Sequence, residues 1–365
     1  MSNNQTATAA ATADYIPPYP PLVDTHGRTF DYMRVAVTEK CNLRCTYCMP
    51  EEGVDFMGKD TLLTTDEFLR IIKAVAQMGI RKVRFTGGEP LVRKDIVRMV
   101  EETAATPGIK IIKMTTNALL LPRYVHRLKE AGLTGLNISL DTLNEEKFLR
   151  ITRRKGLKET LDAIDEAVEV GIPSVKINLV AMRGFNDDEL LDFCEYTKDH
   201  PVTVRFIEFM PFDYEQMWET GGNFLSAEQM CNMIKEAYPN IEDSSGTRTE
   251  HHMFKIPGYA GKVGVIPAFT RSLCVNCSRI RLTSDGNIRN CLYSDKEFGL
   301  RDMIREGCSD EDIMEKFREA FQQKAKDGFI AKKESEEKPV DISALTKKGD
   351  DSTLHVRKSM TQIGG

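Results

Sequence analysis

The chain has 365 residues with 41% hydrophobic and 29% charged side chains and a formal net charge of −5, the composition of an ordinary globular enzyme of one large or two smaller domains. The acidic balance argues against a general nucleic-acid-binding protein, and no apolar run is long enough to span a bilayer. Residues 1–27 lack the basic start and apolar centre of a secretion signal. We therefore expect a disordered leader over 1–27 and a reducing intracellular location, in the cytoplasm or the mitochondrial matrix and not outside the cell.

Short apolar segments alternate with stretches of helical period between residues 32 and 210. The segments read YMRVAVT, KVRFTGG, IKIIKMTT, GLNISLD, SVKINLV and TVRFIEFM. Strand–helix alternation predicts an α/β protein with a parallel sheet and helical crossovers. Six such units predict a partial (β/α)6 barrel of the TIM type over residues 28–212.

Polar side chains recur at every second position of the first five segments, so each set falls on one face of its strand. The sets are Arg34 and Thr38, with the apolar Ala36 between them on the same face; Lys82, Arg84 and Thr86; Lys113, Thr115 and Asn117; Asn137, Ser139 and Asp141; and Lys176 and Asn178. The helices must cover the apolar face, so the polar face points inward, where a filled core would leave these groups unpaired. We expect a hollow, basic interior that receives a substrate; edge strands with one solvated face are the alternative. In the sixth segment Arg205 and Glu208 fall on opposite faces, which predicts a β-bulge or an early strand end.

Three cysteines follow the first strand at close spacing: Cys41, Cys45 and Cys48. A reducing compartment disfavours a disulfide, which would also leave one thiol over. Structural zinc requires four ligands, and the nearest histidine, His26, belongs to the leader. A [4Fe–4S] cluster held by three thiolates leaves one iron open to a ligand. The carboxyl end of a strand is also where barrel enzymes place their active sites.

The pattern changes after residue 211. A helical segment near 226–240 precedes strands with glycine turns, a hairpin around SDGN, and a helical stretch from about 298 to 325. We expect a C-terminal domain over 213–330, a charged linker over 331–351 and a tail over 352–365.

A second cysteine group, Cys274, Cys277 and Cys291, flanks the predicted hairpin. Spacing alone leaves zinc open here, with His251, His252 or Cys308 as the fourth ligand. The remaining cysteines, Cys194, Cys231 and Cys308, fall in helix-like segments and fit small buried side chains.

The motif Cys-x3-Cys-x2-Cys after the first strand, with TGGEP at 86–90, resembles the radical S-adenosylmethionine enzymes. Within that superfamily, YMRVAVTEKCNLRCTYCMPEEG, VRFTGGEPLVR, TTNALLL, NISLDTL, RFIEFMPF, CVNCSRIRLTSDGNIRNCL and the final IGG resemble the GTP 3′,8-cyclase family, which performs the first step of molybdenum-cofactor biosynthesis. The resemblance implies two [4Fe–4S] clusters, one on Cys41, Cys45 and Cys48 and one on Cys274, Cys277 and Cys291. It also implies S-adenosylmethionine as cofactor, and a C-terminal iron–sulfur domain that closes the mouth of the barrel.

The resemblance also assigns individual residues. It implies GTP contacts at Arg34, Lys82, Arg84, Thr115, Lys176, Arg279 and Arg281. It implies S-adenosylmethionine contacts at Tyr47, Gly88, Ser139 and Met210. Candidates for a direct part in catalysis are Lys176, Arg205, Arg279, Arg281, Gly364 and Gly365. Guanidinium groups match phosphate oxygens in a fork, so inward arginines suit a triphosphate.

The implied reaction converts GTP to (8S)-3′,8-cyclo-7,8-dihydroguanosine 5′-triphosphate, by loss of hydrogen from C3′ of the ribose and attack on C8 of the guanine. The implied partners are an electron donor of unidentified nature, a second copy of the chain in a homodimer, and the second-step enzyme, cyclic pyranopterin monophosphate synthase. The alternative is a radical enzyme that modifies a peptide and carries an auxiliary cluster. That alternative leaves the inward cations without a purpose.

The resemblance places the final Gly364 and Gly365 in the active-site pocket. Glycine suits such a tail because it has no side chain to fill the space and bends freely. We expect residues appended after Gly365 to lower turnover while both clusters remain, as measured by product formation and by iron content. Unchanged turnover contradicts this role of the tail.

Overall fold

The computed structural model describes residues 15–49, 54–210, 224–244, 252–270, 274, 277–336 and 361. Up to residue 210 the strands and helices alternate as the sequence predicts. They are β1 Tyr32–Ala36, α1 Thr65–Ala76, β2 Lys82–Thr86, α2 Ile96–Ala104, β3 Ile111–Thr116, α3 Val125–Glu130, β4 Gly135–Ser139, α4 Glu145–Thr152, α5 Leu157–Glu169, β5 Val175–Ala181, α6 Leu190–Tyr196 and β6 Thr203–Glu208. Short 3₁₀ turns lie at Lys59–Thr61, Pro90–Val92, Leu121–Arg123 and Asp187–Glu189.

The later part of the chain holds the predicted helix, strands and hairpin. Its elements are α7 Ala227–Ala237, β7 Glu242–Asp243, β8 His252–Lys255, β9 Lys262–Ile266, β10 Arg279–Leu282, β11 Asn287–Arg289, β12 Phe298–Gly299, α8 Arg301–Arg305, α9 Asp310–Gln322 and α10 Gly328–Glu336. The helical stretch predicted from 298 to 325 therefore begins with a short strand. Reciprocal capping boxes at Thr64, Ser226 and Ser309 fix the starts of α1, α7 and α9.

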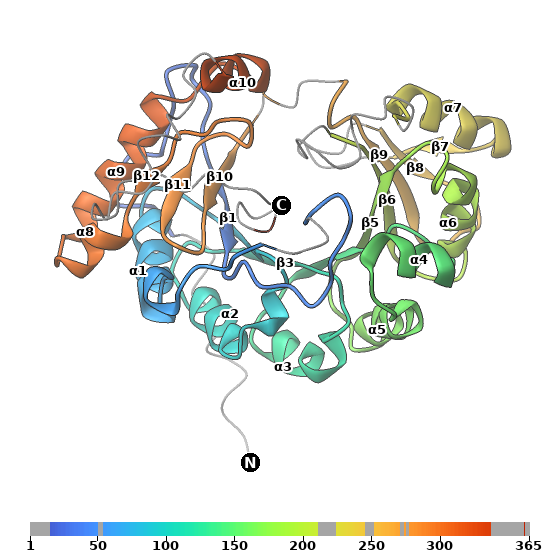
Figure 1. Cartoon of the computed structure of the whole chain (residues 1–365), viewed down its shortest axis with the longest axis horizontal. Helices are drawn as coiled ribbons and strands as arrows, with labels where there is room; N and C mark the ends of the chain where they lie inside the picture. The colour runs from blue at the N-terminus through green and yellow to red at the C-terminus, as the bar shows by residue number, and fades with distance from the viewer. Residues whose placement is uncertain are drawn as a thin grey trace.

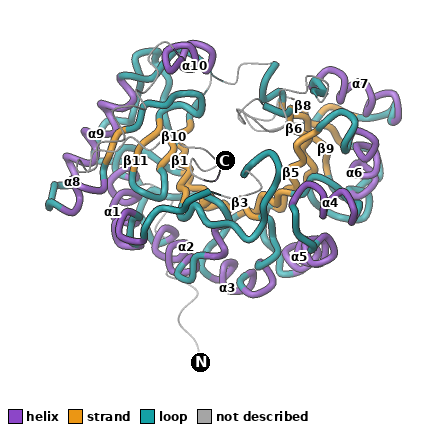
Figure 2. The backbone as a smooth tube through the Cα atoms, in the orientation of Figure 1, coloured by secondary structure: helices purple, strands orange, loops and turns teal. Residues whose placement is uncertain are grey.

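All the described strands belong to one sheet, in the order β12-β11-β10-β1-β2-β3-β4-β5-β6-β9-β8-β7. The strands from β10 to β9 in this order run parallel to one another. The sheet curls with its helices on the outside (Figure 1), and the strands line the inner side of that ring (Figure 2). The C-terminal part thus adds a parallel strand to each edge of the six-stranded barrel, and the boundary expected near residue 212 does not divide the sheet.

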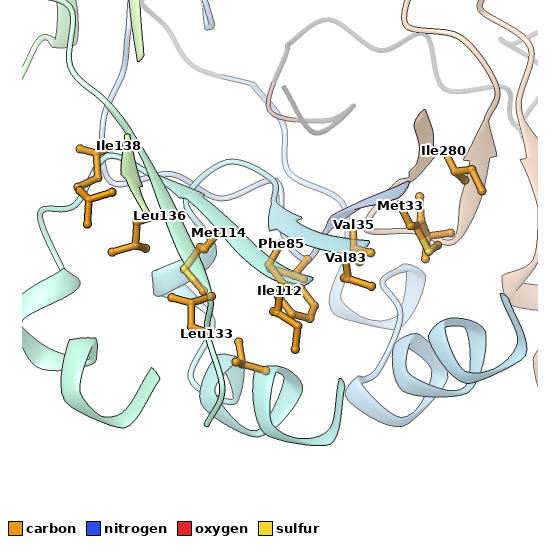
Figure 3. Packing of buried hydrophobic residues seen from close by; sticks show 14 of the residues in the cluster. Met33, Val35, Val83, Phe85, Ile112, Met114, Leu133, Leu136, Ile138 and Ile280 are labelled. Carbon is orange, nitrogen blue, oxygen red and sulfur yellow. The ribbon is translucent and has the colours of Figure 1, made fainter. Parts of the chain in front are cut away.

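The outer face of the sheet is apolar and packs against the helices. Met33, Val35, Val83, Phe85 and Met114 are each fully buried and point toward the helices (Figure 3). Since successive side chains of a strand point to opposite faces, the residues between them face inward.

The predicted irregularity in the sixth strand is wrong. β6 pairs residue for residue with β5, from Lys176 opposite Thr203 to Ala181 opposite Glu208, and its register with β9 is equally continuous. Glu208 is the last residue of β6 and lines the same cavity as Arg205. It accepts hydrogen bonds from the backbone N–H groups of Ala227, at the start of α7, and of Phe269 and Thr270, at 2.7 to 2.8 Å.

The leader expected to be disordered up to residue 27 is folded where the structure describes it, from residue 15. Leu22 is buried, and the hydroxyl of Tyr19 donates a 2.6 Å hydrogen bond to Glu311 of α9. Just after the segment, the ring of Phe30 packs edge-on against Phe321 of α9 at 4.3 Å. These contacts join the segment to α9, so burial of apolar surface outweighs its weak local propensity.

Part of the predicted charged linker is also folded. α10 runs to Glu336, inside the range 331–351, and its buried residue Ala331 anchors it. Residues 337–360 and 362–365, and with them most of the linker and the final Gly364 and Gly365, lie outside the described residues. Among the helices described, none has the length and apolarity needed to span a membrane.

Replacement of Phe85 with alanine tests the outer core. Phe85 has no exposed surface, so Phe85→Ala should lower the free energy of unfolding by about 3 to 5 kcal/mol. Leu149→Ala is the control, since Leu149 is 43% exposed and its replacement should cost under about 1 kcal/mol. Denaturant titration measures both, and equal losses in the two variants contradict the assignment of the outer face as the core.

Candidate active site

The inward face of the sheet encloses a cavity of about 710 Å³, within the range of small-molecule sites. Its wall carries residues of β1 to β6, of β9 and of β10, together with both cysteine groups. The prediction of a hollow, polar interior is confirmed. Lys113, Thr115, Asn117, Ser139, Asp141, Lys176 and Asn178 all line it, as do Arg34, Lys82, Arg84, Thr86, Arg205, Arg279 and Arg281. Thr38 and Asn137, which were also expected to face inward, are buried but are not among the lining residues.

Four cations stand side by side across four neighbouring strands. Arg281 on β10 is in register with Arg34 on β1, Arg34 with Arg84 on β2, and Arg84 with Lys113 on β3. We call these residues the cation row. Adjacent strands lie about 4.8 Å apart, so like charges directly opposite one another repel.

Burial and mutual repulsion disfavour the charged forms of the side chains in the cation row. Burial, then the neighbouring cations, lower the pKa of Arg84 to about 10 although Tyr32 opposes the shift. Burial also lowers the pKa of Lys113 to about 8, with Lys176 and Lys82 adding to it. The pKa of Arg281 is held well below its usual range by the same two causes. Within the described residues the Nε of Arg84 has no hydrogen-bond partner. An anion bound beside these residues would stabilise their charged forms, which burial disfavours.

Tyr32 lies within this cationic surrounding and was not singled out from the sequence. The guanidinium of Arg84 and the ammonium of Lys82 lie 5.4 and 4.4 Å from its ring centroid, in cation–π contact. Its hydroxyl oxygen accepts a 3.2 Å hydrogen bond from Nε of Arg34. Burial opposes ionisation of the phenol, but Arg34, Arg84 and Lys82 together outweigh it and lower the pKa of Tyr32 to about 7.

The first cysteine loop leaves the carboxyl end of β1 and is fastened to the end of α4. Arg44 N–H and Thr46 N–H donate to the carbonyls of Thr152 and Ile151 at 3.0 and 2.9 Å. Arg153 ends α4 in the left-handed conformation, with φ of 57°, and donates to the carbonyls of Arg44 and Met49. These bonds on both sides of Cys45 and Cys48 fix the loop over the cavity.

The TGGEP segment supports the start of the same loop. Gly88 N–H and Glu89 N–H donate to the carbonyls of Thr38 and Lys40, both at 2.8 Å. A Cβ on Gly87 would lie 2.2 Å from the carbonyl oxygen of Thr38, and one on Gly88 would lie 2.3 Å from that of Lys40. Both positions therefore require glycine, because the two backbones touch.

Burial favours the neutral form of the three thiols of the first group. Burial raises the pKa of Cys41, and it raises that of Cys48 to about 12, with Cys41 and Asp141 adding to the effect. Burial and the other thiols also raise the pKa of Cys45 well above its usual range. The thiolates that bind iron would therefore form here only beside cationic charge, which a bound cluster would supply. Among the described residues, no three His, Cys, Asp or Glu side chains converge on a single metal ion. A [4Fe–4S] cluster does not require its ligands to converge on one metal ion, because each thiolate binds a different iron.

The second cysteine group lies at the other end of the cavity from the first. Cys277 precedes β10, and β10 is parallel to β1, whose far end carries the first group. The Sγ of Cys274 accepts a 3.2 Å hydrogen bond from Gly328 N–H. Burial opposes ionisation of Cys277, but Lys324 and Arg279 outweigh it and lower its pKa to about 7, which favours the thiolate that binds iron.

The four residues assigned to S-adenosylmethionine, Tyr47, Gly88, Ser139 and Met210, all line the cavity. Tyr47 donates a 2.7 Å hydrogen bond to Asp141, and the Sδ of Met210 accepts one from Tyr293 at 3.7 Å. Thr361, in the predicted tail, also lines the cavity and its backbone N–H is a hydrogen-bond partner of Cys48.

Several lining residues escaped the sequence reasoning. Lys324 and Tyr293 come from segments without strand alternation, and Arg28 lies at the boundary of the predicted leader. Arg28 donates to the carbonyls of Cys274 and Lys326 at 2.9 and 2.7 Å, so it ties the second cysteine group to the N-terminal segment. No sequence pattern marks such contacts between distant segments.

Family models match most of this site. The Radical SAM superfamily model matches residues 35–197, and the Molybdenum Cofactor Synthesis C model matches residues 202–330. These matches define a radical S-adenosylmethionine enzyme, which binds a [4Fe–4S] cluster and S-adenosylmethionine.

Relatives identify the family within that class. The chain is 43% identical over 308 residues to the GTP 3',8-cyclase of Chlorobaculum tepidum, covering 84% of this chain and 92% of that protein. It is 45% identical over 295 residues to the GTP 3',8-cyclase, mitochondrial, of Arabidopsis thaliana, covering 80% of this chain and 75% of that protein. The chain belongs to the GTP 3′,8-cyclase family. It spans about half, 47%, of the longer Molybdenum cofactor biosynthesis protein 1 of Dictyostelium discoideum, at 46% identity over 80% of this chain.

Solved structures share the fold at low identity. Streptococcus suis SuiB bound to S-adenosylmethionine has a TM-score of 0.52 and 15% identity, over 73% of this chain and 60% of that chain. Native anSMEcpe with bound AdoMet and Cp18Cys peptide has a TM-score of 0.53 and 14% identity, over 82% of this chain and 81% of that chain.

Titration of Tyr32 tests the charge of the cavity. An ordinary tyrosine ionises near pH 10, whereas the surrounding cations lower the pKa of Tyr32 to about 7. The difference in near-ultraviolet absorbance between the wild type and Tyr32→Phe should therefore develop tyrosinate character as pH rises through about 7. A difference spectrum that stays constant until pH approaches 10 shows that the cations do not act on this phenol.

Proposed function

We propose that the chain converts GTP to (8S)-3′,8-cyclo-7,8-dihydroguanosine 5′-triphosphate, the first step of molybdenum-cofactor biosynthesis. The observation that carries the proposal is a cationic cavity between two three-cysteine groups in a chain that covers 92% of a relative named GTP 3',8-cyclase. Both the triphosphate and the radical chemistry then have a place in one enclosed space.

The cation row supplies the binding energy for the triphosphate. Arg34, Arg84 and Arg281 present guanidinium groups that match phosphate oxygens. Lys82, Thr115, Lys176 and Arg279 are the other proposed GTP contacts. Arg205 donates to Oδ1 of Asn178, which fixes its guanidinium toward the cavity. Binding of a polyanion relieves the repulsion within the row, so substrate affinity comes partly from the loss of that repulsion.

The first cysteine group would hold a [4Fe–4S] cluster through Cys41, Cys45 and Cys48, and Tyr47, Gly88, Ser139 and Met210 would hold S-adenosylmethionine beside it. When bound, the cluster supplies the electron that cleaves S-adenosylmethionine to a 5′-deoxyadenosyl radical. The chain's own contribution is to position C3′ of the ribose and to exclude water and other hydrogen donors.

The second cysteine group would hold a further [4Fe–4S] cluster through Cys274, Cys277 and Cys291. Its place at the opposite end of the cavity suits a contact with the purine while the phosphates meet the cation row. Lys324 and Arg279 favour the thiolate at Cys277. The final Gly364 and Gly365, which lie beyond the described residues, are proposed to complete the pocket in which Thr361 already lies.

Further partners follow from the reaction. The enzyme needs an electron donor, and its product needs a second enzyme, cyclic pyranopterin monophosphate synthase. We place the chain in the cytoplasm or the mitochondrial matrix, and expect a homodimer.

The second candidate function is peptide modification by a radical enzyme with an auxiliary cluster. Its only support is the fold that the chain shares with SuiB and anSMEcpe, and it gives the cation row no role.

An anaerobic assay tests the proposal. Chain reconstituted with iron and sulfide receives S-adenosylmethionine, a reductant and one of ATP, GTP, CTP or UTP, and 5′-deoxyadenosine is followed by chromatography. We expect GTP alone to give 5′-deoxyadenosine in proportion to a cyclised nucleotide. Release of 5′-deoxyadenosine that is indifferent to the nucleotide contradicts the proposal and favours a peptide substrate.

Iron content is the control for the two clusters. The chain should hold about eight irons, and a Cys274→Ser, Cys277→Ser, Cys291→Ser variant about four. That variant should lose cyclised product but keep slow cleavage of S-adenosylmethionine. Zinc in place of iron in the second group contradicts the second cluster.

A further inference from the structure

A second set of cations lies at the mouth of the cavity, at the N-terminal ends of β2 and β3. Arg81 immediately precedes β2 and Lys110 immediately precedes β3, and both are exposed on the surface while lining the cavity. Lys82 and Lys113 lie just inside them, on the inward faces of the same strands. We call Arg81, Lys82, Lys110 and Lys113 the mouth cations. Only Lys82 is among the residues that the family resemblance assigns to GTP.

Lys113 connects the mouth to the cation row. It stands in register with Arg84 on β2 and with Gly135 on β4. A Cβ at Gly135 would lie 3.4 Å from Cε of Lys113 and 3.0 Å from the carbonyl oxygen of Ser174. The absence of a side chain at Gly135 therefore leaves room for the aliphatic part of Lys113 to lie across β4, with its ammonium in the cavity.

The mouth cations have no acidic partners of their own. Within the ranges that the structure describes, none of the four side chains forms an ion pair with a carboxylate. Asp31 is the acidic residue of the mouth; it is exposed and acts on Lys82 only at a distance. The hydroxyl of Tyr32 is already engaged by Arg34. Several unneutralised cations around an opening create a positive potential that attracts anions.

We propose that the mouth cations form a polyphosphate-binding site, which captures the terminal phosphates of a nucleoside triphosphate and guides the molecule to the cation row. The identity of the nucleotide rests on the proposed function; the polyphosphate chemistry does not. Two exposed cations at the surface and two half-buried ones behind them give a graded path from solvent to Arg84. Such a path raises the rate of encounter, and its effect declines as salt screens it.

A paired-variant experiment tests the site with inorganic tripolyphosphate as the probe. Arg81→Gln/Lys110→Gln removes two mouth charges. Lys94→Gln/Arg127→Gln removes two charges that are also exposed, near α2 and in α3, outside the cavity. None of these four side chains forms an ion pair in the described structure. Calorimetry on the reconstituted enzyme should show tripolyphosphate binding about tenfold weaker in the mouth variant at low salt. The control pair should bind like the wild type.

Lys113 provides an independent variant. Lys113→Met keeps the aliphatic chain over Gly135 and removes the charge, and Lys113→Arg restores a charge. We expect Lys113→Met to weaken tripolyphosphate binding and Lys113→Arg to recover most of it, with circular dichroism unchanged in both. The value of kcat/KM for GTP should fall by a similar factor in the mouth variant and in Lys113→Met.

The outcomes separate this site from the proposed function. If tripolyphosphate binding weakens as expected but even the wild type does not turn over GTP, the polyphosphate site stands and the cyclase function fails. If the wild type turns over GTP but the mouth variant and Lys113→Met bind tripolyphosphate as the wild type does, the site is wrong and the function stands. Equal weakening of tripolyphosphate binding in the control pair also overturns the site, because the loss would then follow from the net charge of the protein and not from the mouth cations.

Discussion

Repulsion within the cation row is the constraint on which the rest of the structure depends. Arg281, Arg34, Arg84 and Lys113 are held at adjacent positions of four hydrogen-bonded strands. Two unit charges at the strand spacing of about 4.8 Å, in an effective dielectric of about 20, repel by roughly 3 kcal/mol. Side chains that spread apart lower this cost, and the phenol of Tyr32 lowers it further. The repulsion that remains is relieved only when an anion enters the cavity.

Apolar burial on the outer face of the same strands offsets the free-energy cost of the cation row. Met33, Val35, Val83, Phe85 and Met114 bury their side chains against the helices, at about 25 cal/mol for each Å² removed from water. Each strand thus has a stabilising outer face and a destabilising inner face, and the alternation of a β-strand separates the two. The polar interior of the barrel persists because its apolar exterior offsets the cost.

The two cysteine groups depend on the same sheet. β10 pairs with β1 in parallel, so the loop after β1 and the segment before β10 lie at opposite ends of one cavity. Arg153, Gly87 and Gly88 fix the first loop through backbone contacts, and Arg28 and Gly328 fix the second group. A substrate between the ends can meet both groups without any movement of the sheet.

The sequence by itself determined the strand–helix order of the barrel, and it predicted the chemistry of the site. Strand alternation predicted the inward residues Arg84, Lys113 and Lys176, and the spacing of Cys41, Cys45 and Cys48 predicted the first cluster site, because both depend on local period and local ligand chemistry. Only the tertiary structure decided the in-register row, the parallel pairing of β10 with β1, the folding of residues 15–27 against α9, and the cationic surrounding of Tyr32. Those features join segments far apart in the chain, and their energies come from burial and charge proximity, which exist only once the sheet has formed.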